Sequence, residues 1–210
     1  MVTGALFHVK HRYDEAYEAL RVPLPSHSFR DARVSAAEVL GLLDAPDARP
    51  VLFAHPSGKA AWIVQAAAGP VLVDAATGEP IPQASSDVAV EWARAAVAHS
   101  AHAHRYGEVV GQEEAAATSL LGGGRHPALV VHFEGGKRVT VDRLTGELTQ
   151  TGALNDFIDW TYRVHYLQWT PWKGVNVALV IVAVPLVLSL ALSGLWMTRR
   201  RGVARAGPGG

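Results

Sequence analysis

Histidine is the only residue type in this 210-residue chain that is abundant enough to ligate a metal or a redox group, because there are ten His and no Cys. His165 lies in the sequence DWTYRVHY just before a long apolar stretch, and His8 and His11 are three residues apart near the start. Imidazole is a common axial ligand of haem iron, often with one His from each of two helices. His165 is therefore a candidate haem ligand, with His8 or His11 opposite it. The other interpretation makes His165 a polar anchor at a membrane interface, like the Tyr and Trp residues around it.

A second group of histidines, His99, His102 and His104, has a spacing that suits Zn or Cu if a fourth ligand comes from elsewhere. The same stretch fits a solvated helix end, where a charged imidazole meets the negative end of the helix dipole. We favour the helix end and predict no metal site. The remaining histidines outside the N-terminal segment have no partner at metal-ligand spacing and are expected in strands or loops: His55, His126 and His132.

Two pairs of carboxylates occur in short turns, Asp74 with Glu79 and Asp142 with Glu147. Each pair could act as catalytic acid and base or bind calcium, but each also fits a turn that Asp caps and in which Glu begins the next strand. We expect the turn role. The sequence contains no nucleophile elbow, zinc-protease motif, phosphate-binding loop or dinucleotide fingerprint, so we predict no catalytic residues.

The average composition hides a membrane segment. Hydrophobic residues make up 49%, and 19 basic residues balance 19 acidic ones, so the chain lacks the positive charge that nucleic-acid binding requires. Residues 174–198, however, are uncharged, almost entirely Val, Leu, Ile and Ala, and bracketed by Trp and Tyr. About 20 apolar helical residues cross a hydrocarbon core of roughly 30 Å, and these aromatic rings collect at its interfaces. We predict a transmembrane helix over 174–198, after an aromatic juxtamembrane helix over 154–172.

The charges around this helix predict its orientation. Four arginines follow it and outnumber the basic residues just before it: Arg199, Arg200, Arg201 and Arg205. The positive-inside rule therefore places the basic tail 199–210 in the cytoplasm and residues 1–170 outside. The first residues, MVTGALFHVKHRYDEAYEAL, lack the basic and apolar regions of a signal peptide. Either the orientation is inverted or a membrane helix upstream of this sequence is missing.

The region before the membrane helix contains a repeat. VLVDAATGEPIP at 71–82 and VTVDRLTGELTQ at 139–150 share the pattern V-x-V-D-x-x-T-G-E. Alternating β-branched residues predict a strand, the Asp starts a turn, and the Gly supplies a positive φ. More strand signal precedes each copy, and each has a helix upstream, which a capping box opens at Ser35 in the first copy and Ser86 with Asp87 opens in the second. Residues 110–126 are rich in small side chains, and we expect them to be a loop that interrupts the second copy.

The chain resembles the PepSY-associated transmembrane family. The resemblance lies in two helix-and-meander units, in their V-x-V-D-x-x-T-G-E endings and in the sequence RVHYLQW ahead of an apolar helix. The resemblance covers nearly the whole chain. It implies an α+β fold of two tandem PepSY-like helix plus antiparallel β-meander units, 34–82 and 86–150, followed by a single transmembrane helix. Relatives commonly begin with a membrane helix that ends in a TGAL-like sequence, which this chain has at residues 3–6. By this resemblance, a first helix is truncated and residues 1–33 continue from its outer end.

The resemblance also implies a function. PepSY domains are proposed to inhibit or chaperone secreted peptidases, so we expect a protein of the bacterial inner membrane, more in keeping with binding than with catalysis, that regulates an exported partner. Some larger relatives look like haem-containing ferric-siderophore reductases. They imply the alternative, an electron-transfer component for iron uptake with haem b held by His165 and by His8 or His11. The other expected partners are the lipid bilayer and a second membrane helix or a second copy of the chain.

Overall fold

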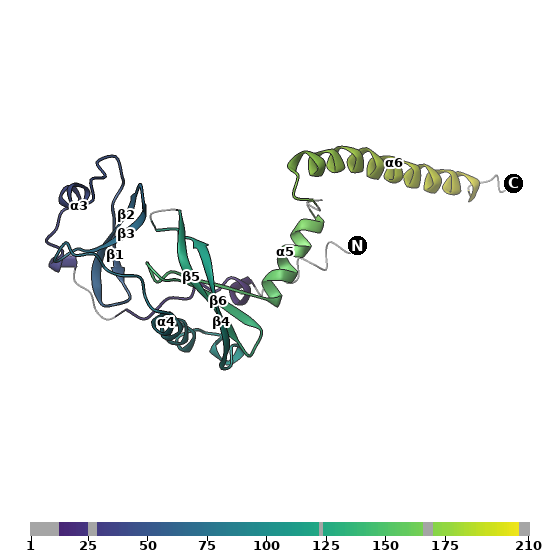
Figure 1. The fold of residues 1–210 in the computed structure, drawn as a ribbon. Helices are drawn as coiled ribbons and strands as arrows, with labels where there is room; N and C mark the ends of the chain where they lie inside the picture. The colour runs from purple at the N-terminus through teal and green to yellow at the C-terminus, as the bar shows by residue number, and fades with distance from the viewer. Residues whose placement is uncertain (1–12, 25–28, 122–123, 166–169, 206–210) are drawn as a thin grey trace. The chain divides into compact units, whose positions relative to one another are not determined.

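The computed structural model describes residues 13–24, 29–121, 124–165 and 170–205. The chain divides into two compact units (Figure 1). His8–Asp156 forms the repeat unit, and Met1–Phe7 together with Phe157–Gly210 forms the anchor unit.

The first copy of the repeat is a short helix packed on a three-stranded antiparallel sheet. α3 (Ala36–Leu42) begins at the predicted capping box, in which the Ser35 hydroxyl accepts the Glu38 N–H and the Glu38 carboxylate accepts the Ser35 N–H. The meander β1 (Val51–His55), β2 (Lys59–Ala66) and β3 (Gly69–Asp74) follows. One face of this sheet is covered by α3, and the apolar contact centres on Val39, Val64 and Val73.

The second copy has the same order with one more strand. α4 (Ser86–Ala98) starts at the N-cap Ser85, one residue before the predicted start, and ends at His99. Its sheet has the order β4 (Val109–Thr118), β5 (Arg125–Phe133), β6 (Lys137–Asp142) and β7 (Leu148–Gly152). The small side chains along α4 let it lie close to one sheet face, and together they enclose the largest apolar core: Ala89, Ala93, Ala96, Val97, Tyr106, Leu129, Val131, Phe133, Val139 and Val141.

The expectation that residues 110–126 form a loop is wrong. Most of this stretch is β4, which pairs with β5 in an antiparallel register that places Ala115 opposite Ala128. Ala and Glu favour helices and loops as single residues, but strand preference depends strongly on cross-strand contacts. Because β4 is an edge strand with mostly exposed side chains, its pairing with the apolar strand β5 decides the structure.

The predicted turns are confirmed in both copies and are closed by the same hydrogen bonds. In the first copy the Asp74 N–H donates to the Glu79 carbonyl (2.8 Å), and the Gly78 N–H donates to the Asp74 carbonyl (2.9 Å). The equivalent bonds 68 residues later measure 2.9 and 2.8 Å. Gly78 and Gly146 have φ angles of 78° and 73°, as the sequence predicted. The repeat is therefore one of backbone geometry as well as of sequence.

The two copies differ in their last strand. In the second copy Val141 pairs with Leu148, the first residue of β7. The equivalent contact in the first copy, Val73 with Pro80, is an isolated bridge. The bonds on either side of this bridge are made by the Glu79 carbonyl and the Ile81 N–H, and Pro80 and Pro82 have no N–H to offer on the outer edge of this segment.

The N-terminal segment is fixed on the second copy. Its first described element is α2 (Tyr13–Ala16), which is held by a hydrogen bond from the Asn155 side-chain amide to the Ala16 carbonyl. The Lys137 ammonium donates to the Glu15 carbonyl (3.3 Å), and the Ser100 hydroxyl donates to Glu18 (2.6 Å). The chain thus enters the repeat unit beside the start of α5 (Ala153–His165), through which it leaves. Two 3-10 turns complete the described elements, η2 (Phe29–Asp31) and η3 (Ala103–Arg105).

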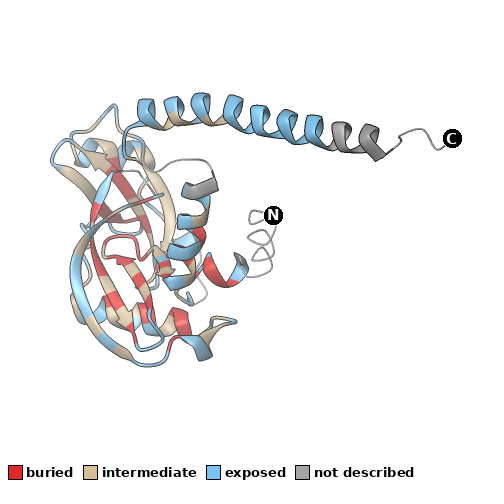
Figure 2. Ribbon diagram, turned by 90° about the vertical axis from the view of Figure 1, so that its right-hand side faces the viewer, coloured by how far each residue is buried: buried red, intermediate tan, exposed pale blue. Residues whose placement is uncertain are grey.

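The anchor unit contains the second part of α5 and all of α6 (Lys173–Arg205). Within α6, Lys173–Met197 is a 25-residue span that is long and apolar enough to cross a membrane. None of it is buried within the protein, and Figure 2 shows this span as exposed, with a few intermediate residues. The Asn176 side chain accepts the Thr170 N–H (3.0 Å) and donates to the Thr170 carbonyl (2.7 Å), which fixes the turn into the helix. An α+β fold with two antiparallel sheets and one C-terminal apolar helix is confirmed.

Candidate functional site

The structure does not test the predicted haem ligands. His8 and His11 lie outside the described residues, and His165 is the last residue of α5, with a side chain that is likewise outside them. Haem ligation by His165 with His8 or His11 stays a prediction.

The histidines after α4 lie in a helix end, as expected. His99 is the C-cap of α4, and its Nδ1 donates to the Ala95 carbonyl (2.8 Å). His102 precedes η3, which contains His104. Among the described residues, no group of three or more His, Asp or Glu side chains is arranged to hold a metal ion.

The first turn carboxylate binds an exposed lysine. Asp74 Oδ1 accepts the Ala76 N–H (2.8 Å), and Oδ2 accepts the Lys59 ammonium (2.7 Å). Burial raises the pKa of Asp74, but the bonds from Lys59 and from the Ala76 N–H outweigh burial and hold the pKa below its ordinary value. The predicted turn-capping role of this carboxylate is confirmed.

The second turn carboxylate binds a buried histidine instead. Asp142 Oδ1 accepts the N–H groups of Leu144 (2.8 Å) and Thr145 (3.1 Å), while Oδ2 lies 2.6 Å from His126 Nδ1. The side chains of His126 and Asp142 are 0% and 3% exposed, whereas that of Lys59 is 57% exposed. The contact of Asp74 with an exposed lysine in the first copy is therefore replaced by an enclosed contact of Asp142 with a histidine in the second.

Strand register shows that Lys59 and His126 occupy equivalent positions. Asp74 lies opposite Ala61 and Asp142 lies opposite Ala128, and each basic residue is two positions before that partner. Residues two apart on a strand point to the same face of the sheet. Sequence reasoning left His126 without a partner, although this register, applied to the repeat, would have indicated Asp142.

His126 lies where the two copies meet. Its Nε2 is 3.3 Å from the amide nitrogen of Gln65, a residue of β2 in the first copy. Because Nδ1 donates its hydrogen to Asp142, Nε2 accepts a hydrogen bond from the Gln65 amide. A chain of polar groups thus connects the sheet of one copy to the turn of the other.

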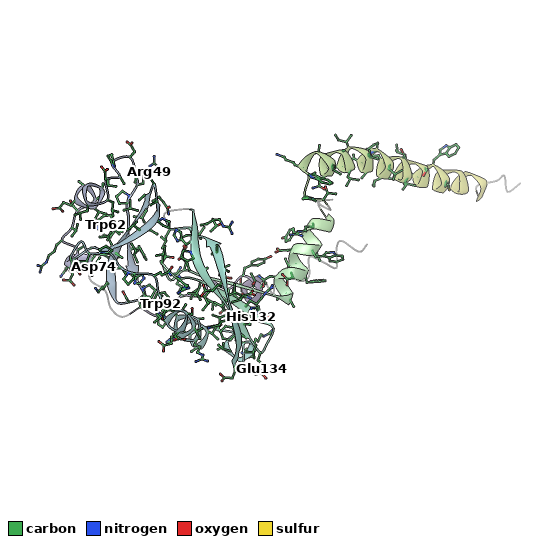
Figure 3. All side chains as sticks on the ribbon, in the orientation of Figure 1. Arg49, Trp62, Asp74, Trp92, His132 and Glu134 are labelled. Carbon is green, nitrogen blue, oxygen red and sulfur yellow. The ribbon has the colours of Figure 1, made fainter. Side chains whose placement is uncertain are left out.

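His55 makes a second connection from the first copy to the second. Its Nε2 is 2.9 Å from the Leu144 carbonyl, and its Nδ1 is 3.2 Å from the Ser57 nitrogen and 2.7 Å from the Ser57 hydroxyl. Because a carbonyl only accepts and a backbone N–H only donates, Nε2 carries the hydrogen and the ring is neutral. The ring also stands edge-on to Trp92 of α4, labelled in Figure 3, with 5.6 Å between centroids. We call the following contact set the joint: His55, Gln65, His126, Asp142 and Leu144.

The bond between Ser57 and His55 raises the question of catalysis, which the sequence did not. A hydroxyl bonded to a neutral imidazole is the first requirement of an activated serine nucleophile. Here the same nitrogen also accepts the N–H of Ser57, and the other nitrogen binds a carbonyl instead of a carboxylate. This geometry closes the turn between β1 and β2 and attaches it to the second copy, so we assign the pair a structural role.

The joint is expected to weaken in acid. Burial is the main influence on the pKa of His55 and lowers it from 6.5, against the opposite effects of the Leu144 carbonyl and Asp142. The folded protein therefore binds fewer protons than the unfolded chain, and the stability from this group is complete above pH 6.5 and is lost as the pH falls below it. We expect the urea midpoint of the full chain in detergent to decrease from about pH 7.5 to about pH 5, and to decrease less in His55→Gln. Equal decreases in the two proteins would contradict this.

The tip of the β4–β5 hairpin also connects the copies. Glu147 Oε2 accepts the Ser119 hydroxyl (2.5 Å) and the N–H groups of Leu120 (3.0 Å) and Leu121 (3.3 Å). The Leu121 side chain then packs on the second face of the first sheet, whose core contains Ala61, Ile63 and Leu72. The hairpin is therefore held at both its base and its tip, and β4 is a fixed edge.

The hydrogen bonds of β5 show which backbone groups of β4 point away from the sheet. The Pro127 carbonyl accepts a hydrogen bond from Arg143, which follows β6, so the odd-numbered residues of β5 face β6 and the even-numbered ones face β4. The β4 residues that pair with those even-numbered residues bond β5: Gly111, Glu113, Ala115 and Ala117. The residues between them direct their N–H and C=O groups away from the sheet: Gln112, Glu114, Ala116 and Thr118.

This outer edge is open in the part of the chain that the structure describes, where none of the four outward residues has a backbone–backbone hydrogen bond outside its own sheet. β4 is ten residues long, twice the length of β1, the edge strand of the first sheet, and all its side chains are exposed or partly exposed. A long edge strand with free backbone donors and acceptors can pair with another extended segment. The β4 edge is the candidate functional site.

Comparisons of this chain with protein-family models, with curated proteins and with solved structures find no match.

Proposed function

We propose that this chain is a membrane-anchored, non-catalytic binding protein of the PepSY type. In this proposal α6 crosses the bacterial inner membrane, with the arginines after it in the cytoplasm and the repeat unit outside. The β4 edge then binds an extended segment of an exported protein, such as a peptidase that it inhibits or chaperones. The observation that carries the proposal is the open ten-residue edge of β4 in a chain with an apolar helix of membrane-spanning length.

Binding at a strand edge agrees with how the polar side chains are used. The groups that could do chemistry are committed to the fold: Asp74 and Asp142 close turns, and His55 and His126 connect the two copies. A strand edge needs none of them, since backbone groups supply the affinity and side chains on the two faces supply the selectivity. The resemblance to PepSY proteins, which are proposed to act on secreted peptidases, supports the same class of function.

The proposal is tested with a synthetic peptide of about ten alternating Val and Thr residues, the length of an ordinary strand. The peptide carries a fluorescent label, is kept at nanomolar concentration and is titrated with the full chain in detergent. We expect binding, measured by fluorescence anisotropy, and a loss of affinity of tenfold or more in Ala116→Pro. That substitution removes an N–H that points away from the sheet, so the β4–β5 ladder is left intact.

Two controls identify the backbone as the binding element. Ala116→Ser changes the same side chain but keeps the N–H, and it should bind like the unmodified chain. A peptide N-methylated at every residue has no N–H on either edge and should not bind. If Ala116→Pro, with an unchanged circular dichroism spectrum, binds the peptide as well as the unmodified chain does, then β4 is not the site.

A further inference from the structure

The side chains at the middle of β4 differ in how far they are committed to the fold. Glu114 accepts two bonds from Arg143 (2.9 and 2.8 Å) and one from the Ser86 hydroxyl (3.1 Å). Glu113, on the opposite face of the strand, has a side chain that is 64% exposed and one ion contact, 3.4 Å from Nε2 of His132, the strand β5 residue labelled in Figure 3. Glu113 is therefore an exposed carboxylate at the centre of the edge that can pair with a cation.

A second copy of the chain is a poor occupant of this edge. Two antiparallel β4 strands related by a two-fold axis can bond only if outward residues meet outward residues, since inward residues are bonded to β5. Of the registers that satisfy this condition, the two with the longest overlap are centred on Glu113 and on Glu114. Each puts two carboxylates directly opposite each other, which destabilises a strand pair. The charges at the centre of β4 thus disfavour pairing of the chain with itself.

The same geometry favours a cationic side chain opposite Glu113 on a strand that is added to the β4 edge. The Glu113 N–H points toward β5, so on the outer side Glu113 takes part in a non-hydrogen-bonded pair, the type in which side chains lie closest. The neighbours of Glu113 on its face are Ala115 and Ala117, whose small side chains leave room for larger apolar side chains on an added strand.

We infer that the strand received by β4 carries a Lys or Arg opposite Glu113. This inference depends on the proposed function and adds the chemistry of the partner: an extended segment with a central basic residue and apolar residues on the same face. The arrangement disfavours a second copy of the chain and an acidic segment.

The inference is tested with three versions of the Val/Thr peptide that carry Lys, Gln or Glu at the central position, at low ionic strength. We expect the Lys peptide to bind about threefold more tightly than the Gln peptide and about tenfold more tightly than the Glu peptide. Glu113→Lys should reverse this order, and Glu113→Gln should remove most of it. Glu91→Lys, with the same charge change on the exposed side of α4, should leave the order as it is.

The outcomes separate the two proposals. Suppose that the three peptides bind equally and that Ala116→Pro still abolishes their binding. This result would overturn the inference of a basic partner and keep β4 as the binding edge. The basic partner would also be overturned if Glu113→Lys bound the three peptides in the same order as the parent chain, because another acidic residue would then be responsible for that order. Failure of every peptide to bind would overturn both proposals. If the chain forms dimers, and if Ala116→Pro dissociates them, then a second copy does pair at β4 and that part of the inference is overturned.

Discussion

Replacement of Asp142 by Ala is expected to lower the free energy of unfolding of the repeat unit by about 3 kcal/mol or more, because three buried donors lose their acceptor. The carboxylate satisfies three groups at once, the N–H groups of Leu144 and Thr145 and the ring of His126, and all of these lie in a region closed to water. An unsatisfied buried donor costs about 1–3 kcal/mol. The measurement is urea unfolding of the full chain in detergent, followed by tryptophan fluorescence, to which Trp62 and Trp92 contribute from the repeat unit.

The first copy supplies the matched control. Asp74→Ala removes the same turn cap, but the basic partner of Asp74 is the exposed Lys59, which water can solvate. We expect a loss of about 1–2 kcal/mol there. Asp142→Asn keeps an oxygen for the two N–H groups and should fall between the two alanine variants. Equal losses in Asp74→Ala and Asp142→Ala would show that burial of His126 and Asp142 adds nothing to the turn.

Gly146→Ala is expected to cost about 2–5 kcal/mol, for two independent reasons. The residue has a φ of 73°, where a side chain other than that of Gly is strained by about 1–2 kcal/mol. An added Cβ would also lie 2.2 Å from Pro56 Cγ, in the turn that carries His55. The expected result is a large decrease in the urea midpoint, together with weaker attachment of the first copy to the second.

Gly78→Ala isolates the backbone part of this effect. Gly78 has nearly the same φ, 78°, but a Cβ there would meet only Leu42 Cδ1 at 3.4 Å and Val34 Cγ2 at 3.6 Å. It should cost only about 1–2 kcal/mol. The added substitution Pro56→Ala should recover part of the loss in Gly146→Ala and none of the loss in Gly78→Ala. Without that recovery, contact with Pro56 is not the cause.

Local signals were sufficient to predict most of the elements. The capping box at Ser35 marked the start of α3, and the alternating Val residues before Asp74 and Asp142 marked β3 and β6. These features depend on residues a few positions apart, so a sequence contains them directly. The long run of Val, Leu, Ile and Ala after Lys173 likewise predicted α6.

The errors and omissions came from contacts between distant residues. The alanines of β4 have no strand signal of their own, and their structure depends on β5 and on a hairpin tip held by Glu147. His126 and His55 were predicted to lie in strands or loops, which they do, but their partners Asp142 and Leu144 are 16 and 89 residues away. Only the offset between the two copies, combined with strand register, could have indicated the first of these pairings.

The order of strands in the second sheet also determines how the protein would carry mechanical force. A partner bound at β4 and a helix fixed in a membrane through α5 would pull on opposite edges of the sheet β4-β5-β6-β7, since α5 directly follows β7. Tension would cross the hydrogen bonds of the three strand pairs, with the Glu114–Arg143 and Glu147–Ser119 contacts acting beside them. The strength of these ladders and of the contacts beside them, and not the stability of the whole unit, would then limit how strongly a captured partner can be held at the membrane.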